Sequence, residues 1–184
     1  MIKSKGWDWK IVKDDIDCPW KIPSVESYYL LNRWENLNFK NFLDLGCGLG
    51  RHTVLFAKNG FNVSGFDISK EGIRKTKEWL KNLDLKADLK VGDMLELPYE
   101  NESFDCILCR NVISHQDTQG VKQIIKELYR VLKNNGECYL TLGSKSTWGF
   151  KQDSWPLVDE NTRLRMEEGP EYKIPHFYAD YDLI

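Results

Sequence analysis

Short apolar runs of strand length alternate with stretches of helical periodicity between residues 41 and 142, and this alternation limits the possible folds more than any other feature. Five runs have strand-like composition, at residues 42–45, 61–66, 88–91, 104–109 and 137–142. The stretches with helical spacing cover residues 52–58, 69–82 and 118–132, and Ser69 and Thr118 are the expected N-caps of the last two. Strands joined by helical crossovers form a parallel sheet with right-handed connections, and ligands bind at the carboxyl ends of such strands. The sequence therefore predicts an α/β fold with a doubly wound, mainly parallel sheet.

The remaining residues flank this region on both sides. The chain has 184 residues, which fits one compact domain and would be cramped for two. Residues 1–40 are expected to form an N-terminal cap segment with one helix at 24–36, and residues 143–184 an irregular tail. Both segments are rich in aromatic residues, so we expect them to fold over the open end of the sheet. The lysine-rich start is predicted to be a frayed, solvated terminus without a function.

Composition and charge exclude several classes of protein. The 26 basic and 28 acidic residues give a net charge of -2 and are interspersed, so no nucleic-acid-binding face is expected. No stretch reaches the roughly 20 apolar residues of a membrane span, and the start lacks the apolar core of a signal peptide. We therefore expect a cytoplasmic protein without membrane contacts. The cysteines are expected to be reduced, and Cys106 and Cys109 lack the second pair of a zinc site, so no metal is expected.

A glycine-rich turn follows the first strand, in the sequence Leu-Asp-Leu-Gly-Cys-Gly-Leu-Gly at residues 43–50. Glycines permit a tight turn and let backbone amides approach a ligand, and the following helix N-terminus favours a negative group. A dinucleotide-binding fingerprint would require a third glycine at the position of Arg51. The turn therefore indicates a ligand site and argues against an NAD-dependent oxidoreductase.

Carboxylates stand at the ends of three successive strands, at Asp44, Asp67 and Asp93. Asp67 ends the second strand, where a carboxylate accepts hydrogen bonds from both hydroxyls of a ribose, as in NAD or S-adenosylmethionine. Asp93 follows the third strand, where it can accept a hydrogen bond from an adenine amino group. The three acids around one glycine turn predict an adenosine-containing ligand, and Asp93 favours S-adenosylmethionine.

With these motifs, residues 41–142 resemble the class I, Rossmann-like S-adenosylmethionine-dependent methyltransferases, especially the type that acts on small molecules. Residues 104–107 resemble the family's fourth-strand signature, and residues 131–136 its turn into strand five. The resemblance implies that Gly46, Cys47, Gly48 and Gly50 cradle the methionine end and that Asp44 fixes the loop and the amino group. It further implies a cofactor contact for each of Asp67 (ribose), Ile68 (adenine face), Asp93 and Met94 (adenine edge), and Arg110 (methionine portion). S-adenosylhomocysteine would be the product.

The chain departs from the family pattern after strand five. The family sheet continues with a helix and an antiparallel strand pair, and too few residues remain before Ile184 for both. We therefore expect strand five at an exposed sheet edge, where a homodimer could form because unpaired edges invite pairing. The chain could also be a fragment, which leaves a non-catalytic S-adenosylmethionine-binding or assembly module as the alternative function.

The acceptor site is less defined by the sequence. His115, after the fourth strand, is the candidate general base, and a hydrogen bond to its own loop is the equally weighted alternative. Trp20, Tyr28 and Asn111 are candidate acceptor contacts. The tetrad of the nucleic-acid-modifying branches is absent after strand four, so a small-molecule acceptor is expected.

Overall fold

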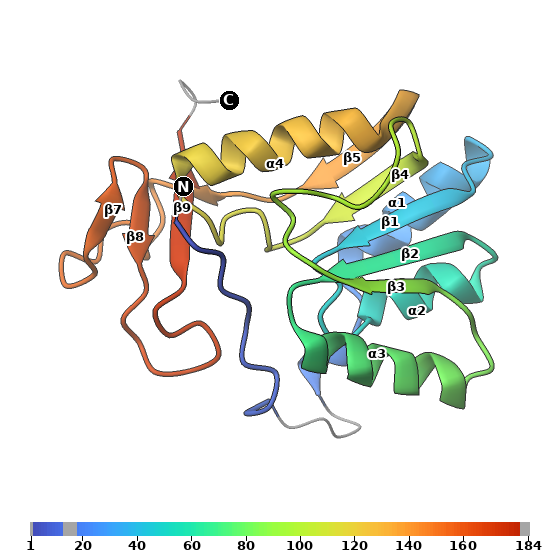
Figure 1. The fold of residues 1–184 in the computed structure, drawn as a ribbon, viewed down its shortest axis with the longest axis horizontal. Coiled ribbons are helices and arrows are strands. Elements are labelled where there is room, and N and C mark those ends of the chain that lie inside the picture. Colours follow the sequence, from blue (N-terminus) through green and yellow to red (C-terminus); the bar gives the residue numbers. More distant parts are fainter. Residues whose placement is uncertain (1, 13–17, 181–184) are drawn as a thin grey trace.

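The computed structural model describes residues 2–12 and 18–180. Its centre is a five-stranded sheet in the order β3-β2-β1-β4-β5, in which every neighbouring pair is parallel (Figure 1). The strands are β1 Asn41–Leu45, β2 Asn62–Asp67, β3 Asp88–Val91, β4 Phe104–Cys109 and β5 Leu132–Leu140. This order belongs to a doubly wound, Rossmann-like sheet, whose winding reverses between β1 and β4. The predicted fold class is confirmed.

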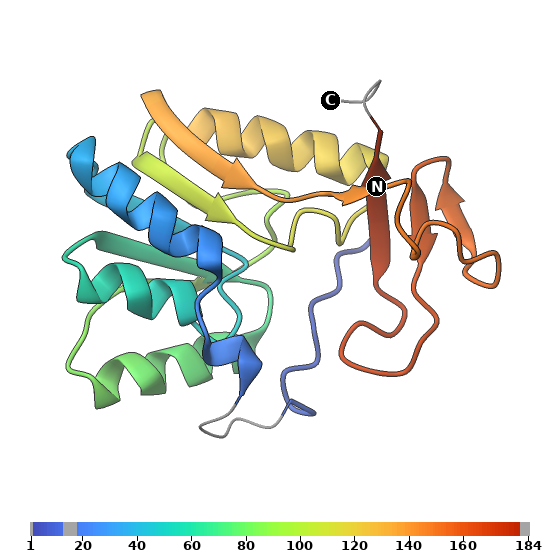
Figure 2. The same ribbon diagram turned by 180° about the vertical axis from the view of Figure 1, so that it is seen from behind.

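Helices cover both faces of the sheet (Figures 1 and 2). The α-helices in the described part of the chain are α1 Val25–Asn36, α2 Arg51–Lys58, α3 Lys70–Asn82 and α4 Thr118–Val131. Phe42 of β1 lies in a core with side chains of α1 and α2, whereas Leu43 lies in the core that α4 covers. Cys106 and Cys109 divide between the same two cores. Successive strand side chains point to opposite faces, and this alternation separates the two cores.

Helix α1 is attached to the edge strand β5 through one buried side chain. Trp34 is fully buried and packs on the rings of Phe42 and Phe56. Its indole nitrogen donates a hydrogen bond to Glu137 Oε2 at 2.9 Å, and Arg33 pairs with the same carboxylate. The N-terminal cap segment is therefore tied to the edge strand β5 through the C-terminal half of α1.

Two boundaries differ from the sequence-based expectation. The N-cap of α4 is Asp117 rather than Thr118, because the Asp117 carboxylate accepts a hydrogen bond from the amide of Gly120 at 2.7 Å. β5 starts at Leu132, directly after α4, and its register with β4 is irregular between the Phe104 and Cys106 pairs. Residues 133–136, which the sequence indicated as a turn, are thus included in the strand.

The tail forms a second sheet instead of an irregular segment. Its strands are β6 Gly143–Ser144, β7 Leu157–Asp159, β8 Thr162–Leu164 and β9 Pro175–Ala179, in the order β6-β9-β8-β7. The amide of Phe177 donates a hydrogen bond to the carbonyl of Ser114 at 2.8 Å, so β9 is attached to the loop that follows β4. Figure 1 shows this sheet beyond the N-terminal end of α4, near the carboxyl ends of the central strands. Strands of two or three residues have too little periodicity to be recognised in a sequence.

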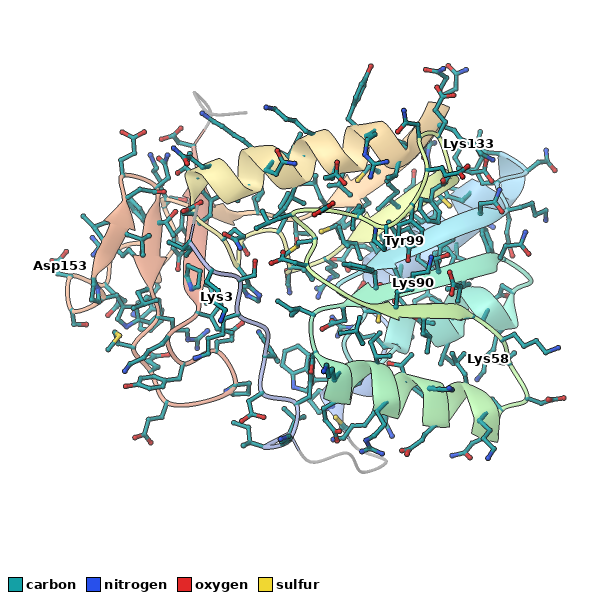
Figure 3. The ribbon with its side chains drawn as sticks, in the orientation of Figure 1. Lys3, Lys58, Lys90, Tyr99, Lys133 and Asp153 are labelled. Atoms are coloured by element: carbon teal, nitrogen blue, oxygen red, sulfur yellow. The ribbon has the colours of Figure 1, made fainter. Side chains whose placement is uncertain are left out.

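The edge position expected for the fifth strand is confirmed. Among the described residues, β5 pairs only with β4 in the central sheet, and the chain then leaves for the second sheet. The basic side chains are dispersed, with Lys3, Lys58 and Lys133 far apart in Figure 3. Within the described ranges, no helix combines the length and the apolar character that crossing a bilayer requires.

Candidate active site

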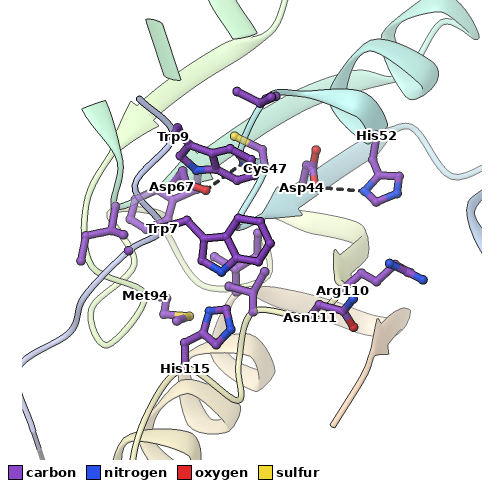
Figure 4. A pocket seen from close by; sticks show the side chains of 18 of the residues that line it. Trp7, Trp9, Asp44, Cys47, His52, Asp67, Met94, Arg110, Asn111 and His115 are labelled. Carbon is purple, nitrogen blue, oxygen red and sulfur yellow. Dashed lines mark hydrogen bonds and ion pairs between the residues drawn. The ribbon is translucent and has the colours of Figure 1, made fainter. Parts of the chain in front are cut away.

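A cavity lies at the carboxyl ends of the central strands, where the winding of the sheet reverses (Figure 4). It encloses about 920 Å³ of empty space, part of which is open to solvent. The sequence-predicted residues that line it are Trp20, Asp44, Gly46, Cys47, Gly48, Asp67, Ile68, Asp93, Met94, Arg110, Asn111 and His115. The fold therefore brings together residues from the ends of β1 and β2 and from the loops that follow β3 and β4.

The glycine turn is fixed by its left-handed backbone. Gly46 and Gly48 have φ angles of +74° and +54°, which L-residues with side chains rarely adopt. A Cβ at Gly46 would lie 2.3 Å from a methyl carbon of Val112, so this position also has no room for a side chain. The amides of Gly46 and Cys47 both donate to the carbonyl of Phe66, at 2.7 and 3.1 Å. These bonds attach the turn to the end of β2.

Asp44 is buried between the turn and the first helix turn of α2. Its Oδ2 accepts hydrogen bonds from the amide and the hydroxyl of Thr53, at 2.8 and 2.6 Å. Burial raises the pKa of Asp44 to about 6, although the two Thr53 bonds oppose the shift. His52 Nδ1 lies 3.9 Å from Asp44 Oδ1, and burial lowers the pKa of His52 to about 3, so this imidazole is neutral near pH 7. Asp44 thus has a neutral neighbour and retains the capacity to bind a cationic group.

Asp67 connects the turn to α3. Its Oδ2 accepts a hydrogen bond from the Gly48 amide at 2.8 Å, and its Oδ1 accepts one from the Ser69 amide at 2.7 Å. Burial raises the pKa of Asp67, while both amides act in the opposite direction. A carboxylate has about four acceptor positions, so Asp67 can accept further hydrogen bonds from a ligand in the cavity. The third acid, Asp93, uses Oδ1 to accept a hydrogen bond from the Leu95 amide at 3.1 Å.

The start of the chain forms part of the cavity, which corrects the expectation of a solvated terminus. Residues 4–9, here called the N-terminal strap, run between the second sheet and the central sheet, and Figure 1 shows this segment in blue. The Trp7 ring lies 5.0 Å from Trp9 and 4.6 Å from Trp20, measured between ring centroids. The Trp9 ring lies directly over Gly48, because a Cβ there would be 2.6 Å from Trp9 Cζ2.

Polar contacts hold the strap on both sides. Lys75 of α3 donates to the carbonyl of Trp9 at 3.1 Å, and Lys5 donates to the carbonyl of Tyr172 at 2.6 Å. Two tryptophans within three residues were the available signal in the sequence, and burial of such rings over a ligand site is a common outcome.

His115 meets two side chains that sequence reasoning did not identify. Its Nε2 lies 3.5 Å from Glu171 Oε1, and His176 Nε2 lies 3.5 Å from the other oxygen of the same carboxylate. Burial lowers the pKa of His115, while Glu171 opposes the shift. Burial also opposes ionisation of Glu171, but its interactions with both imidazoles outweigh this effect and hold the pKa of Glu171 well below its usual range. The sequence around Glu171 and His176 has no pattern that would have revealed this cluster.

Two predicted site residues do not line the cavity. Tyr28 is 52% exposed, because the inward face of α1 is taken by residues such as Leu30, Leu31 and Trp34. Its predicted contact with the acceptor therefore has no support in this structure. Gly50 is the N-cap of α2, with φ of +86°, and a Cβ there would lie 2.5 Å from a Thr76 carbon. Its position shapes the turn and does not face the ligand space.

Comparison with known proteins agrees with this geometry. A family described as "Methyltransferase domain" matches residues 42–136, which is half of the chain. A demethylmenaquinone methyltransferase from Lactobacillus johnsonii is 31% identical over 129 residues, covering 63% of this chain and 52% of that protein. The chain thus spans about half the length of this curated relative.

Two solved structures cover more of the chain. The PH0226 protein from Pyrococcus horikoshii is 25% identical, with a TM-score of 0.66 over 87% of this chain and 79% of that one. A SAM-dependent methyltransferase from Methanosarcina mazei is 26% identical, with a TM-score of 0.67 over 78% and 74% of the two chains. Because the family match, the strand order and the glycine turn coincide, this chain belongs to the class I, Rossmann-like methyltransferases, whose cofactor is S-adenosylmethionine.

Proposed function

We propose that this chain binds S-adenosylmethionine in the cavity and catalyses transfer of its methyl group to a small-molecule acceptor. The observation that carries the proposal is the convergence of Asp44, Asp67 and Asp93 with Gly48 on one cavity at the strand ends. When bound, the cofactor supplies an electrophilic methyl group on a sulfonium, and direct displacement by the acceptor leaves S-adenosylhomocysteine. The protein's contribution is to align the two molecules and to exclude water.

We assign the cofactor contacts from the positions of the cavity residues. Asp44 would accept hydrogen bonds from the amino group, and the turn of Gly46, Cys47 and Gly48 would contact the methionine end together with Arg110. Asp67 would accept hydrogen bonds from the ribose hydroxyls through the acceptor positions that its two amide partners leave. Ile68, which is 36% exposed, would cover one adenine face, and Asp93 and Met94 would contact the adenine edge.

Titration calorimetry with S-adenosylmethionine and S-adenosylhomocysteine tests the proposal. We expect both to bind, and we expect tryptophan emission to change on binding, because the Trp9 ring must leave its position over Gly48 for a ligand to contact this turn. The matched control is Trp9→Phe, which should bind the cofactor but lose most of the emission change. Absence of binding by either ligand would rule out the proposed function.

The acceptor class is suggested by the relative named for demethylmenaquinone methylation. A hydroquinone-type aromatic molecule is therefore the first acceptor to assay, with released S-adenosylhomocysteine as the readout. Trp20 and Asn111 line the cavity and remain candidates for acceptor contacts. Binding of the cofactor without turnover of any acceptor would favour the alternative, a non-catalytic binding or assembly module. A homodimer through the β5 edge stays a prediction, since the structure contains one chain. Cytoplasmic location also stays a prediction.

Cofactor affinity should depend on pH through Asp44. Its pKa of about 6 means that the carboxylate needed by a cationic amino group is protonated in acid. We expect the Kd for S-adenosylmethionine to rise about tenfold between pH 7 and pH 5, as for a single titrating group. The control ligand is 5′-methylthioadenosine, which lacks the amino group and should show no such loss.

Unfolding caused by the titration of Asp44 would not explain a loss of S-adenosylmethionine affinity between pH 7 and pH 5. The pKa of Asp44 is about 6 in the folded chain, above the value of about 3.9 for an unfolded aspartate. The folded state therefore binds more protons between these values, and the Asp44 contribution to stability falls as pH rises through them. Acidification to pH 5 strengthens folding at this residue, so a melting curve at each pH separates the two effects. Equal pH dependence for both ligands would contradict the role of Asp44.

A further inference from the structure

We propose that Glu171 positions and polarises His115, and that this pair removes the proton of a hydroxyl group on the methyl acceptor. The inference rests on the proposed function, because it assigns the base and the acceptor class of the same cavity. His115 comes from the loop after β4 and faces the cavity near Met94 and Asn111 (Figure 4). Glu171 comes from the segment between β8 and β9, so the second sheet supplies one half of the pair.

The orientation of the His115 ring leaves one nitrogen for the acceptor. Nε2 faces Glu171 Oε1 at 3.5 Å, and the side chains of both residues are largely buried. This separation is longer than a formed hydrogen bond, and such contacts often shorten when the substrate is bound. Among the described residues, no side chain or backbone group is hydrogen-bonded to His115 Nδ1. Nδ1 is therefore the atom that can accept a proton from a molecule in the cavity.

Glu171 is held in place by groups that do not line the cavity. The Arg165 guanidinium pairs with its carboxylate, and His176 Nε2 lies 3.5 Å from Oε2. The backbone adds a clamp: the Ile174 amide donates to the Glu171 carbonyl at 3.0 Å, and the Arg165 amide donates to the Ile174 carbonyl at 3.0 Å. The carboxylate is therefore prearranged before any ligand enters.

The charges around His115 suit a base that is neutral at rest. Burial, His176 and Arg165 all lower the pKa of His115, whereas Glu171 raises it. The imidazole is thus unprotonated near pH 7, and the Glu171 carboxylate is ready to stabilise the imidazolium that forms when a proton arrives. This arrangement matches the division of roles between a general base and the carboxylate that orients it.

A hydroxyl group on the acceptor would require the base that His115 and Glu171 provide. A phenolic hydroxyl has a pKa of about 10, so at pH 7 it is almost fully protonated and is a poor nucleophile. As the bond from the acceptor to the methyl carbon forms and the sulfur–methyl bond breaks, the hydroxyl proton moves to His115 Nδ1. The sulfonium becomes a neutral thioether and the positive charge resides on the imidazolium, so charge balances before the proton is released to solvent.

A metal site is the competing interpretation of the same residues. The potential ligand atoms of His115, Glu171 and His176 all lie within 4.8 Å of one another, and two histidines with one carboxylate can bind transition metals. Arg165 argues against this interpretation, because its guanidinium already supplies a positive charge to the carboxylate and would repel a divalent cation.

The test compares Glu171→Gln with the wild type and with the matched control Glu168→Gln, which changes an exposed carboxylate of the same segment, after calorimetry has shown that each binds S-adenosylmethionine. With 2-methyl-1,4-naphthohydroquinone as the probe acceptor, we expect Glu171→Gln to lower kcat about 100-fold, with the KM for S-adenosylmethionine within about twofold. The acidic limb of the kcat–pH profile should also move to lower pH, because the imidazolium loses its carboxylate. Glu168 is exposed, does not line the cavity and does not pair with Glu171, so kcat of Glu168→Gln should change less than about threefold. Retention of kcat by Glu171→Gln would overturn the proposal.

A second measurement does not depend on the acceptor. The chain has three histidines, so NMR can follow the titration of His115 in the wild type and in Glu171→Gln. We expect its pKa to be lower in the variant, and an unchanged pKa would refute the pairing even if the probe acceptor were inactive. Titration with Zn²⁺ alone completes the test: micromolar binding that disappears in Glu171→Gln would replace the base with a metal site. Cofactor binding fails only if the proposed function fails, so the two failures are distinguishable.

Discussion

Replacing Asp67 with alanine should weaken S-adenosylmethionine binding about 100-fold or more. A hydrogen bond to a charged group contributes about 1.5–3 kcal/mol, and the proposed contacts involve two ribose hydroxyls. The substitution also removes the carboxylate that accepts from the Gly48 amide at 2.8 Å, so the glycine turn is attached to α3 only through the Thr76 hydroxyl, which donates to the Gly48 carbonyl at 2.9 Å. Calorimetry at pH 7 measures the change in Kd.

Two further variants test whether the loss of affinity comes from the Asp67 carboxylate itself. Asp67→Asn keeps one carbonyl oxygen for the Gly48 amide, and we expect a smaller loss of about tenfold because only the charge and one acceptor are removed. Asp88→Ala is the matched control, since Asp88 lies on the neighbouring strand β3, pairs with Lys90 at the surface and does not line the cavity. Binding by Asp67→Ala at wild-type affinity would show that the ribose lies elsewhere.

The cofactor half of the cavity was predictable from the sequence because its residues follow a topological rule. Carboxyl ends of parallel strands meet at one edge of a sheet, so Asp44, Asp67 and Asp93 could be placed together without knowing any contact. The glycine turn was predictable for a similar reason, since its spacing reports the backbone that a ligand requires. Both predictions rest on short sequence patterns, the acids at the strand ends and the spacing of the glycines, and the parallel sheet determines where these residues lie.

The acceptor half was not predictable, because it depends on contacts between distant segments without local patterns. Glu171 lies in the connection between the short strands β8 and β9. Nothing near it in the sequence indicates that it contacts His115. Trp7 and Trp9 lie in a segment whose lysines indicated a solvated terminus, yet both line the cavity. Tyr28 is the opposite case: the helical spacing of Leu30, Leu31 and Trp34 defines the buried face of α1, and Tyr28 lies outside this face.

Asp44 combines structural and ligand-binding roles, and the second large effect separates them. Gly50, the N-cap of α2, has no side chain to accept a hydrogen bond from the first helical turn. Asp44 performs this function from β1 by accepting from the Thr53 amide and hydroxyl, both of which belong to a fully buried residue. Asp44→Ala would leave two buried donors without a partner, and we expect a loss of about 3 kcal/mol in the free energy of unfolding.

Asp44→Asn should preserve the fold and lose the ligand. The amide oxygen can still accept from Thr53, and the substitution removes a carboxylate whose pKa is raised to about 6 by burial, so unfolding in urea at pH 7 should change by less than about 1 kcal/mol. Affinity for S-adenosylmethionine should nevertheless fall about tenfold to a hundredfold, because the amino group loses its counter-charge. The same substitution at Asp105, at the opposite end of the sheet where its carboxylate accepts from the Lys40 and Asn41 amides, should leave affinity unchanged. Wild-type affinity in Asp44→Asn would restrict Asp44 to capping α2, and the cationic end of the cofactor would then have to be bound by another group in the cavity.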